Sequence, residues 1–484
     1  MRHSMRLVDL AVILAYLIAI TGFGARFRKG QSSLRDYFLG GRTAPWWAIA
    51  LSIVSAETST LTIVGTPGLA FAGDLGFLQL VFGYLLARIV ISVIFLPQYF
   101  RGEMYTAYEL MRRRFGERMR RITASIFLVT RALAEGVRVF AVSLVISIVL
   151  GTGEMASIIL IVGLTLFYTF EGGMTAVIWT DVVQMGLYVA GAVVSLAVIL
   201  AQVPGGLAHV WAIASAAGKL HVFNFGFSPS LHFFSGTYTF WAGLLGGCFL
   251  TMASHGTDQL MVQRLLSARD LRQSRLALLA SWVVIFFQFS LFLAIGVALF
   301  VYYQDASLVP PHVLDRIYPE FVWRHLPTGI AGLVMAAILA AAMANLSAAL
   351  NSLASTTVVD FARKARPRSE AGALRFARGM TVLWGAILVA IGMLARHWGS
   401  VLESGLSIAS VTLGLLLGVF LLGVLTRRVH EWAALAGLLA GLAAILYVRS
   451  YTPIAWTWWV LIGSTVTFLA GYAASFLPLR AESA

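Results

Sequence analysis

The sequence has few charged residues and almost no cysteine. Only 12% of its 484 residues are charged, against about 25% in an ordinary soluble domain, while 59% are apolar. This composition excludes a soluble globular protein. The single cysteine, Cys248, lies in an apolar run, which excludes a disulfide framework and a CxxC metal site. HExxH, GxSxG and P-loop motifs are also missing from the sequence, which argues against a polytopic membrane enzyme.

Thirteen apolar stretches are long enough to cross a bilayer, because a membrane helix needs about 20 mostly apolar residues. The first is interpreted as a retained helix rather than a signal peptide, since Arg26, Arg28 and Lys29 follow it without a small-residue cleavage pattern. The longest polar segments, 204–237 and 304–328, are too short for a soluble domain and predict a gate or a cap. The thirteen stretches lie at about 8–25, 44–71, 76–100, 121–150, 155–171, 174–203, 238–263, 276–303, 329–360, 377–397, 402–425, 431–449 and 455–477.

Lysine and arginine are distributed unevenly among the loops. The loops after odd-numbered stretches hold 25 of them, whereas the N-terminus and the loops after even-numbered stretches hold 7. The positive-inside rule then places the N-terminus outside and the C-terminus in the cytoplasm, in a multi-pass protein of the cytoplasmic (inner) membrane. The formal charge of +14 is therefore topogenic charge facing anionic lipid, and does not indicate a nucleic-acid partner. Six arginines in 105–121 predict a segment along the inner leaflet.

Two of the stretches combine polar residues with helix-breaking residues. Residues 55–60 read SAETST and are followed by GTPG at 65–68, while residues 254–259 read SHGTDQ after a glycine pair at 246–247. A broken helix persists in a membrane only where it lines a cavity or binds something. The two stretches lie five spans apart, and a second copy of a five-span unit enters the membrane upside down, as in inverted-repeat transporters. The pattern therefore predicts a midplane binding site at these breaks.

A third stretch carries a face of small residues. Positions 341, 344, 345, 348 and 352 share one helical face, with Asn345 at its centre. Such a face lets another backbone approach closely, as an oxygen-lined cation site between 44–71 and 329–360 would require. Two further glycine pairs, at 414 with 418 and at 437 with 441, predict close helix packing only.

The motifs of this chain resemble those of the sodium:solute symporters, which include sodium-coupled carriers for sugars, proline, pantothenate, sialic acid and iodide. The strongest signature is EGGMTAVIWTDVVQ at 171–184. The others, in order along the whole chain, are YFLGG at 37–41, GTPG at 65–68, TDQLMVQR at 257–264 and the stretch from Leu346 to Asp360.

The resemblance implies an all-α integral membrane protein of about thirteen transmembrane helices with a five-plus-five inverted-repeat, LeuT-like core. The chain would form a single transporter domain, 1–484. Its expected parts are a first helix and loop (1–43), repeat 1 (44–203), repeat 2 (238–425) and two C-terminal helices (426–484).

The resemblance also implies the ligands of a main sodium site. They are the backbone carbonyls of Ser55, Thr58 and Ala341, together with side-chain oxygens at positions 344 and 345. The family commonly has Ser followed by Ser or Thr there, whereas this chain has Ala344 and Asn345. One hydroxyl ligand is lost, and the amide of Asn345 can still offer a carbonyl oxygen.

Some members have a second sodium site, which uses the acid of the Thr-Asp motif and serines of the ninth span. Asp181 and Ser347 are present in this chain. Ala344 and Ala348 occupy the other places, so we expect this second site to be incomplete.

Ionisable residues at membrane depth cost about 2.5–3.5 kcal/mol each, so each implies a partner or a wet cavity. Glu57 lies beside the implied sodium site, and three roles stay open for it: cation binding, proton coupling, or a structural hydrogen bond to unwound backbone. Arg131, Glu135 and Arg138 recur on one helical face, so two cations share one acid. They form a structural ion network, or the uncompensated positive charge pairs with an acid of another span, Glu57 or Asp181, or with an anionic substrate.

The guanidinium fork suits a carboxylate, which favours a carboxylate-bearing solute. Sugar carriers of the family place a lysine near their ligand, but no lysine lies in any of the thirteen stretches here. The candidate solute-binding residues are Thr62, Asp258, Gln259, Gln288, Arg131 and Arg138, and Asp258 also has a structural interpretation.

The sequence therefore predicts a secondary active symporter, and not an enzyme, that imports a small organic solute with sodium by alternating access. Its expected partners are the solute, Na⁺ as coupling ion and membrane lipid, with no other cofactor or metal and no obligate protein partner. Two alternatives stay open: a proton-coupled or uncoupled carrier of the same fold, and a membrane solute sensor.

Overall fold

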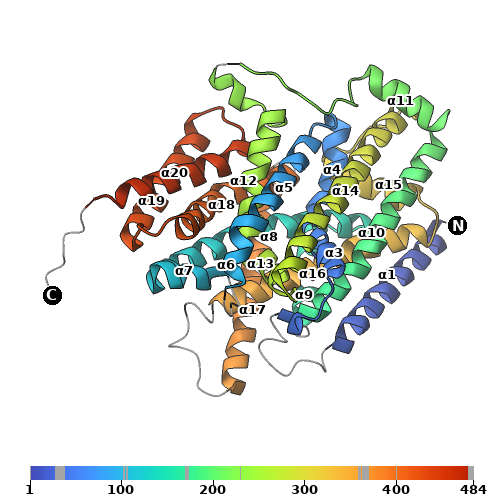
Figure 1. The fold of residues 1–484 in the computed structure, drawn as a ribbon. Helices are drawn as coiled ribbons and strands as arrows, with labels where there is room; N and C mark the ends of the chain where they lie inside the picture. Colours follow the sequence, from blue (N-terminus) through green and yellow to red (C-terminus); the bar gives the residue numbers. More distant parts are fainter. Residues whose placement is uncertain are drawn as a thin grey trace. The chain divides into compact units, whose positions relative to one another are not determined.

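The computed structural model describes residues 2–27, 39–101, 104, 107–168, 174–228, 230–357, 361, 370–398 and 401–477. Throughout these residues the regular elements are helices, and no strand occurs among them (Figure 1). The all-α expectation is confirmed. The motif segments 37–38, 171–173 and 358–360, and the side chain of Ala344, lie outside the described residues.

The helices follow the apolar runs, because backbone polar groups must pair within the segment where no water is available. In the described chain, nine helices are long and apolar enough to cross a membrane, and the bent pair α3 and α4 makes ten. These coincide with ten of the thirteen predicted stretches, whereas the apolar helical segments within 155–171, 238–263 and 377–397 are too short to cross a membrane by the same criterion. The α-helices are α1 (Arg2–Ala25), α3 (Trp46–Glu57), α4 (Thr60–Ala72), α5 (Leu78–Val90), α6 (Leu96–Tyr99), α7 (Ala107–Phe115), α8 (Glu117–Leu150), α9 (Glu154–Tyr168), α10 (Met174–Gln202), α11 (Gly206–Ala216), α12 (Gly247–Gly256), α13 (Gln259–Leu266), α14 (Leu271–Asp305), α15 (Ile317–His325), α16 (Ile330–Thr356), α17 (Glu370–Ala395), α18 (Val401–Leu425), α19 (Glu431–Tyr451) and α20 (Trp459–Ala474).

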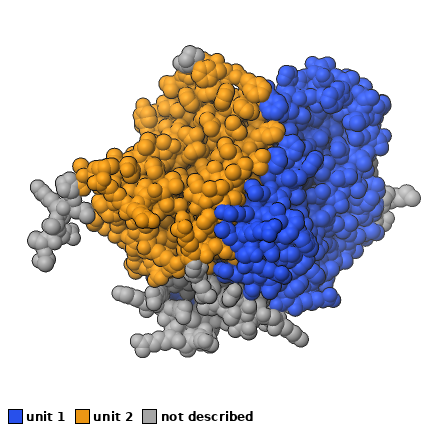
Figure 2. Space-filling view, in the orientation of Figure 1, with its two compact units in different colours: residues 1–78, 131–223, 267–405 blue, residues 79–130, 224–266, 406–484 orange. Residues whose placement is uncertain are grey.

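The chain divides into two compact units, which Figure 2 draws in different colours. The first unit comprises residues 1–78, 131–223 and 267–405, and the second comprises residues 79–130, 224–266 and 406–484. Helices α8 and α18 each contribute residues to both units. The break between α3 and α4 therefore belongs to the first unit, and the break between α12 and α13 to the second.

In the first unit, the interruption predicted in 44–71 falls at the polar residues and not at the proline. Helix α3 ends at Glu57, α4 begins at Thr60, and their axes are bent by 60°. Pro67 lies inside α4 without ending it. A Cβ added at Gly68 would lie 2.8 Å from the carbonyl oxygen of Leu314. The glycine of this segment therefore allows close packing, whereas the polar residues mark the break.

The C-terminal half of α4 is covered by both long polar loops. The amine of Lys219 donates hydrogen bonds to the carbonyl oxygens of Phe71 and Ala72, at 2.8 and 3.0 Å. Helix α15 and the 3₁₀ turn Leu314–Arg316 pack against the same helix. In this structure the two loops thus form a cap over the end of α4.

In the second unit, the stretch 238–263 is interrupted between α12 and α13. Asp258 lies at this break, and its Oδ1 accepts a hydrogen bond from the Leu260 N–H at 2.9 Å, which satisfies a donor in the first turn of α13. A Cβ added at Gly247 would lie 2.6 Å from the carbonyl oxygen of Leu80. Here too the glycine permits close packing, and the polar residues lie at the break.

The two later glycine pairs pack against α20, also within the second unit. A Cβ added at Gly414 would lie 3.0 Å from the carbonyl oxygen of Val460, and one at Gly437 would lie 2.8 Å from the Cα of Gly471. Helices α19 and α20 lie side by side (Figure 1). The predicted packing role of these glycines is confirmed.

Candidate functional site

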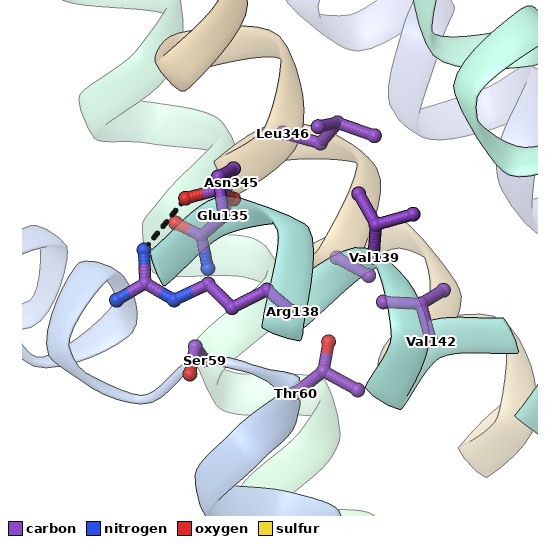
Figure 3. A pocket seen from close by; sticks show the side chains of 9 residues that line it. Ser59, Thr60, Glu135, Arg138, Val139, Val142, Asn345 and Leu346 are labelled. Atoms are coloured by element: carbon purple, nitrogen blue, oxygen red, sulfur yellow. Dashed lines mark hydrogen bonds and ion pairs between the residues drawn. The ribbon is translucent and has the colours of Figure 1, made fainter. Parts of the chain in front are cut away.

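A cavity of about 220 Å³, including its open mouth, lies within the first unit. It is formed by three elements that the sequence singled out separately: the α3–α4 break, the charged face of α8 and the small-residue face of α16 (Figure 3). Much of this volume belongs to the mouth, and the enclosed part holds about one water molecule, so in this conformation the cavity fits an ion or a water. Its lining residues are Ser59, Thr60, Glu135, Arg138, Val139, Val142, Ala342, Asn345 and Leu346.

The ion network of α8 forms one wall of the cavity. Glu135 is buried, and its Oε2 lies 2.8 Å from Nη1 of Arg138 and 3.9 Å from Nη1 of Arg131. Arg138 lines the cavity, whereas Arg131 does not. Among the described residues, the buried Nε of Arg138 has no hydrogen-bond partner. Such a donor costs about 1–3 kcal/mol when it stays unsatisfied, so the guanidinium retains binding capacity for a ligand.

Polar side chains surround this guanidinium. Ser59 and Thr60 lie on the side of the Arg138 side chain away from Glu135 in Figure 3, and Asn345 lies beside Glu135. Within the described chain, the side chains of Ser59, Thr60 and Asn345 make no hydrogen bond to another residue. Two hydroxyls and an amide are therefore available to an ion or a solute in this cavity.

The backbone at the α3–α4 break exposes carbonyl groups. Thr58 still donates its N–H to Val54 O at 2.7 Å, as in a helix, but the N–H of Ser59 donates to Glu57 O at 3.0 Å instead of to Ser55 O. Carbonyls at a helix C-terminus carry the negative end of the helix dipole, which favours a cation. The predicted sodium ligands Ser55 and Thr58 lie at this end.

The predicted residues Ala341, Ser347 and Glu57 are near neighbours in sequence of residues that line the cavity. Ala341 precedes the lining residue Ala342, and Ser347 is half-buried one position after Leu346. Glu57 is half-buried at the last position of α3.

Helix α10 links the two halves of the proposed ion site. The Ser52 hydroxyl donates to Oδ2 of Asp181 at 2.6 Å, and both side chains are buried. One turn later, Nε2 of Gln184 donates to Ala340 O at 3.4 Å. The helix that carries the acid predicted for the second sodium site therefore contacts both α3 and α16.

Gln288 and Thr62 belong to the same unit without lining the cavity. Nε2 of Gln288 donates to Oγ1 of Thr58, and the Tyr188 hydroxyl donates to Oε1 of Gln288 at 3.5 Å. Thr62 is buried within the first turns of α4. Gln288 thus holds the side chain of Thr58, the residue after α3, and does not line the cavity.

The two candidates from the second unit have backbone partners. Oε1 of Gln259 accepts a hydrogen bond from the Ala107 N–H at 2.7 Å, at the start of α7. Asp258 caps α13 as described above. The structural interpretation of Asp258 is the one that its geometry supports.

Several lining residues were not singled out from the sequence as binding residues. Val139 and Val142 share one helical face with Glu135 and the predicted Arg138, because the four follow the spacing i, i+3, i+4 and i+7. The two valines were overlooked because apolar residues fill every face of a membrane helix. Ser59 and Thr60 belong to the polar run at the break, although only its neighbouring positions were predicted as ligands.

Comparison with known proteins identifies the chain's family. The sequence profile of the sodium:solute symporter family matches residues 37–441. The chain belongs to this family. It is 28% identical to the sodium/sialic acid symporter NanT of Aliivibrio fischeri, over 97% of this chain and 93% of that protein. It is 30% identical to the Homo sapiens sodium/iodide cotransporter, over 91% of this chain and 69% of that protein.

A solved structure of the family has the same fold over nearly the whole chain. The substrate-bound outward-open state of a Na⁺-coupled sialic acid symporter superposes with a TM-score of 0.84 at 27% identity, covering 97% of this chain and 98% of that one. The protein is therefore a multi-pass membrane transporter and not an enzyme. It is a secondary active symporter that couples a small organic solute to sodium by alternating access, with Na⁺ as its coupling ion.

Proposed function

We propose that the solute carries a carboxylate, which binds Arg138 in the cavity of the first unit. The observation that carries this proposal is the buried Nε of Arg138, which has no hydrogen-bond partner in the described part of the chain, while Nη1 is held by Glu135. A carboxylate can pair with the free edge of the guanidinium through two parallel hydrogen bonds. Glu135 then fixes the orientation of the arginine while the solute completes its bonding.

The solutes of the relatives agree with an anion at this position. Sialic acid bears a carboxylate, and iodide is an anion. The flat fork of a guanidinium matches a carboxylate better than a spherical halide, because two parallel N–H groups meet two oxygens. The hydroxyls of Ser59 and Thr60 would add donors to such a solute.

The proposed main sodium site combines the backbone carbonyls of Ser55, Thr58 and Ala341 with the amide oxygen of Asn345. Two observations support this assignment. The carbonyl of Ser55 does not accept the Ser59 N–H, and Asn345 lines the cavity. Ala344 can contribute only its backbone. A second site at Asp181 and Ser347 stays a proposal, and the Ser52 hydroxyl already occupies one oxygen of that acid.

The proposed architecture has thirteen membrane helices and two inverted repeats, 44–203 and 238–425, within one transporter domain that also includes 1–43 and 426–484. Breaks in corresponding helices, α3–α4 and α12–α13, support the repeat. The excess of lysine and arginine in alternate loops supports an N-terminus outside, a C-terminus in the cytoplasm and the inner membrane as location. Lipid, solute and Na⁺ are the expected partners, with no obligate protein partner.

The carboxylate proposal is tested with two matched variants. Arg138→Gln and Arg131→Gln each remove one cation that shares Glu135, but only Arg138 lines the cavity. The purified protein is screened by thermal shift against carboxylates, amino acids, sugars and iodide, each in sodium and in potassium. A ligand that binds the folded state raises the unfolding temperature.

We expect Arg138→Gln to weaken the carboxylate by about 30-fold or more, since truncating one partner of a buried charge pair costs about 2–5 kcal/mol. Arg131→Gln should retain carboxylate affinity and lose only stability. Equal losses in both variants would identify a structural network and refute the assignment. A shift produced by a neutral sugar but by no carboxylate would also refute it.

The sodium assignment is tested with Asn345→Leu, with Asn345→Ser as its control. Leu removes the amide oxygen, whereas Ser restores a hydroxyl ligand, so only the Leu variant should lose sodium-dependent binding. Glu57→Gln distinguishes the roles of that acid, because proton coupling predicts uptake that no longer depends on pH. Unchanged sodium dependence in both Asn345→Leu and Glu57→Gln would place the ion elsewhere.

A further inference from the structure

An arginine-rich surface of the second unit has no part in the transport site. It consists of residues 107–121, which form α7 and the start of α8, and residues 425–432, which join α18 to α19. The two segments contain eight arginines and three glutamates, a formal charge of +5. Nη2 of Arg114 donates to the Thr426 carbonyl oxygen at 3.1 Å, which holds the segments together. We call these residues the arginine surface.

Two of the glutamates neutralise a defined subset of the arginines. Glu109 pairs with Arg112 at 2.7 Å and with Arg113 at 3.2 Å, and Glu117 pairs with Arg120 at 3.3 Å. Burial raises the pKa of Glu109, but hydrogen bonds and charge from Arg112 and Arg113 outweigh it, so its pKa is lowered overall. Its carboxylate thus remains charged and paired.

Besides the half-buried Arg114, three arginines of this surface have no carboxylate partner among the described residues. Arg118, Arg427 and Arg428 are exposed, and within the described chain no acidic group lies at ion-pair distance from them. Their charge is available to an anion from outside the protein.

Aromatic rings hold two of these guanidinium groups at the membrane boundary. The guanidinium carbon of Arg118 lies 4.3 Å from the ring centroid of Trp432, and that of Arg428 lies 4.4 Å from the ring centroid of Phe476. Trp432 and Phe476 are each 54% exposed. Since α18 and α19 are each apolar enough to cross a membrane, the turn between them lies where the bilayer meets water. Exposed aromatic rings at this depth are typical of contact with lipid headgroups.

We infer that Arg118, Arg427 and Arg428 bind the phosphate headgroup of an anionic phospholipid at the α18–α19 turn. Guanidinium groups form charge-assisted hydrogen bonds with phosphate oxygens, and clustered arginines at the membrane surface attract anionic lipid. Trp432 and Phe476 orient two of the arginines and offer apolar surface to the neighbouring acyl chains. The full-length chain would therefore be more stable in a bilayer that contains anionic lipid.

The test compares the purified full-length protein in nanodiscs of phosphatidylcholine alone and in nanodiscs that also contain phosphatidylglycerol. Phosphatidylglycerol should raise the thermal unfolding midpoint of the unmodified protein. The variant R118Q/R427Q/R428Q should lose this increase while keeping the midpoint measured in phosphatidylcholine. The control variant R112Q/R113Q/R120Q removes the same number of charges from the arginine surface, but only paired ones, and should keep the increase.

Two outcomes would overturn the inference. Equal losses in the test and control variants would mean that the lipid responds to overall charge and not to these three arginines. An equal increase from inorganic phosphate in phosphatidylcholine nanodiscs would identify a free-phosphate site instead of a lipid site. If the triple variant does not fold, R427Q replaces it, with bound phosphatidylglycerol counted by native mass spectrometry and retention of the lipid contradicting the inference.

Discussion

Lys219 is predicted to hold the end of α4 against the loop that follows α11. Its amine donates to the last-turn carbonyls of Phe71 and Ala72 and lies 4.4 Å from the ring centroid of Phe300. These carbonyls have no partner inside the helix and carry the negative end of its dipole, so a cation there is favourable. Burial lowers the pKa of the Lys219 amine, and Asp74 partly offsets this shift.

The expected effect of Lys219→Met is a loss of about 2 kcal/mol in local stability. Each hydrogen bond to a charged group contributes about 1.5–3 kcal/mol, and the cation–π contact about 0.5–1 kcal/mol. Ordering the lysine side chain and removing it from water offset part of this gain, by about 2 kcal/mol for the ordering alone. A change of 2 kcal/mol corresponds to about a 30-fold change in the opening equilibrium.

Hydrogen exchange measured by mass spectrometry reports this opening. Peptides from α4 and from the segment around Lys219 should exchange about 30-fold faster in Lys219→Met, because local opening governs their exposure. Peptides from α20 should not change. Lys219→Arg keeps a cationic donor and should exchange nearly as slowly as the unmodified protein. Unchanged exchange in Lys219→Met would refute the reasoning.

Two further predictions concern other contacts of the first unit. Oδ1 of Asp9 accepts hydrogen bonds from the N–H groups of Gly329 and Gly332, at 2.7 and 2.9 Å, so α1 caps the start of α16. Asp9→Ala should destabilise the protein by about 2 kcal/mol, and an unfolding midpoint equal to that of the unmodified protein would contradict this cap. Burial, with a smaller effect of Arg324, lowers the pKa of His325. The folded state therefore binds this proton more weakly than the unfolded state, and stability should fall as the pH drops below about 6.5. The thermal unfolding midpoint of His325→Gln, measured from pH 8 to pH 5, should fall less steeply on acidification than the midpoint of the unmodified protein. An equally steep fall would assign the acid sensitivity to other groups.

The sequence by itself determined that this is a helical membrane transporter. Low charge and long apolar runs leave helices as the only way to pair the backbone in lipid, so the spans could be located from composition. The glycines that permit close packing in α18 and α19 were also predictable, because small residues four positions apart on an apolar helix let a neighbouring helix approach closely. The polar runs at 55–60 and 254–259 located both breaks, since polar side chains at membrane depth need a partner.

Only the tertiary structure decided which residues share a cavity. Arg131 and Arg138 lie on the same face of α8 by their spacing of seven residues, so the sequence treats them alike. They are separated by about 10 Å along the helix axis, at 1.5 Å per residue, and therefore meet different neighbours. Arg138 lies level with Ser59 and Asn345, which come from distant parts of the chain. The position of one residue along its helix relative to residues on other helices is set by how whole helices pack against one another. No local sequence pattern specifies this packing.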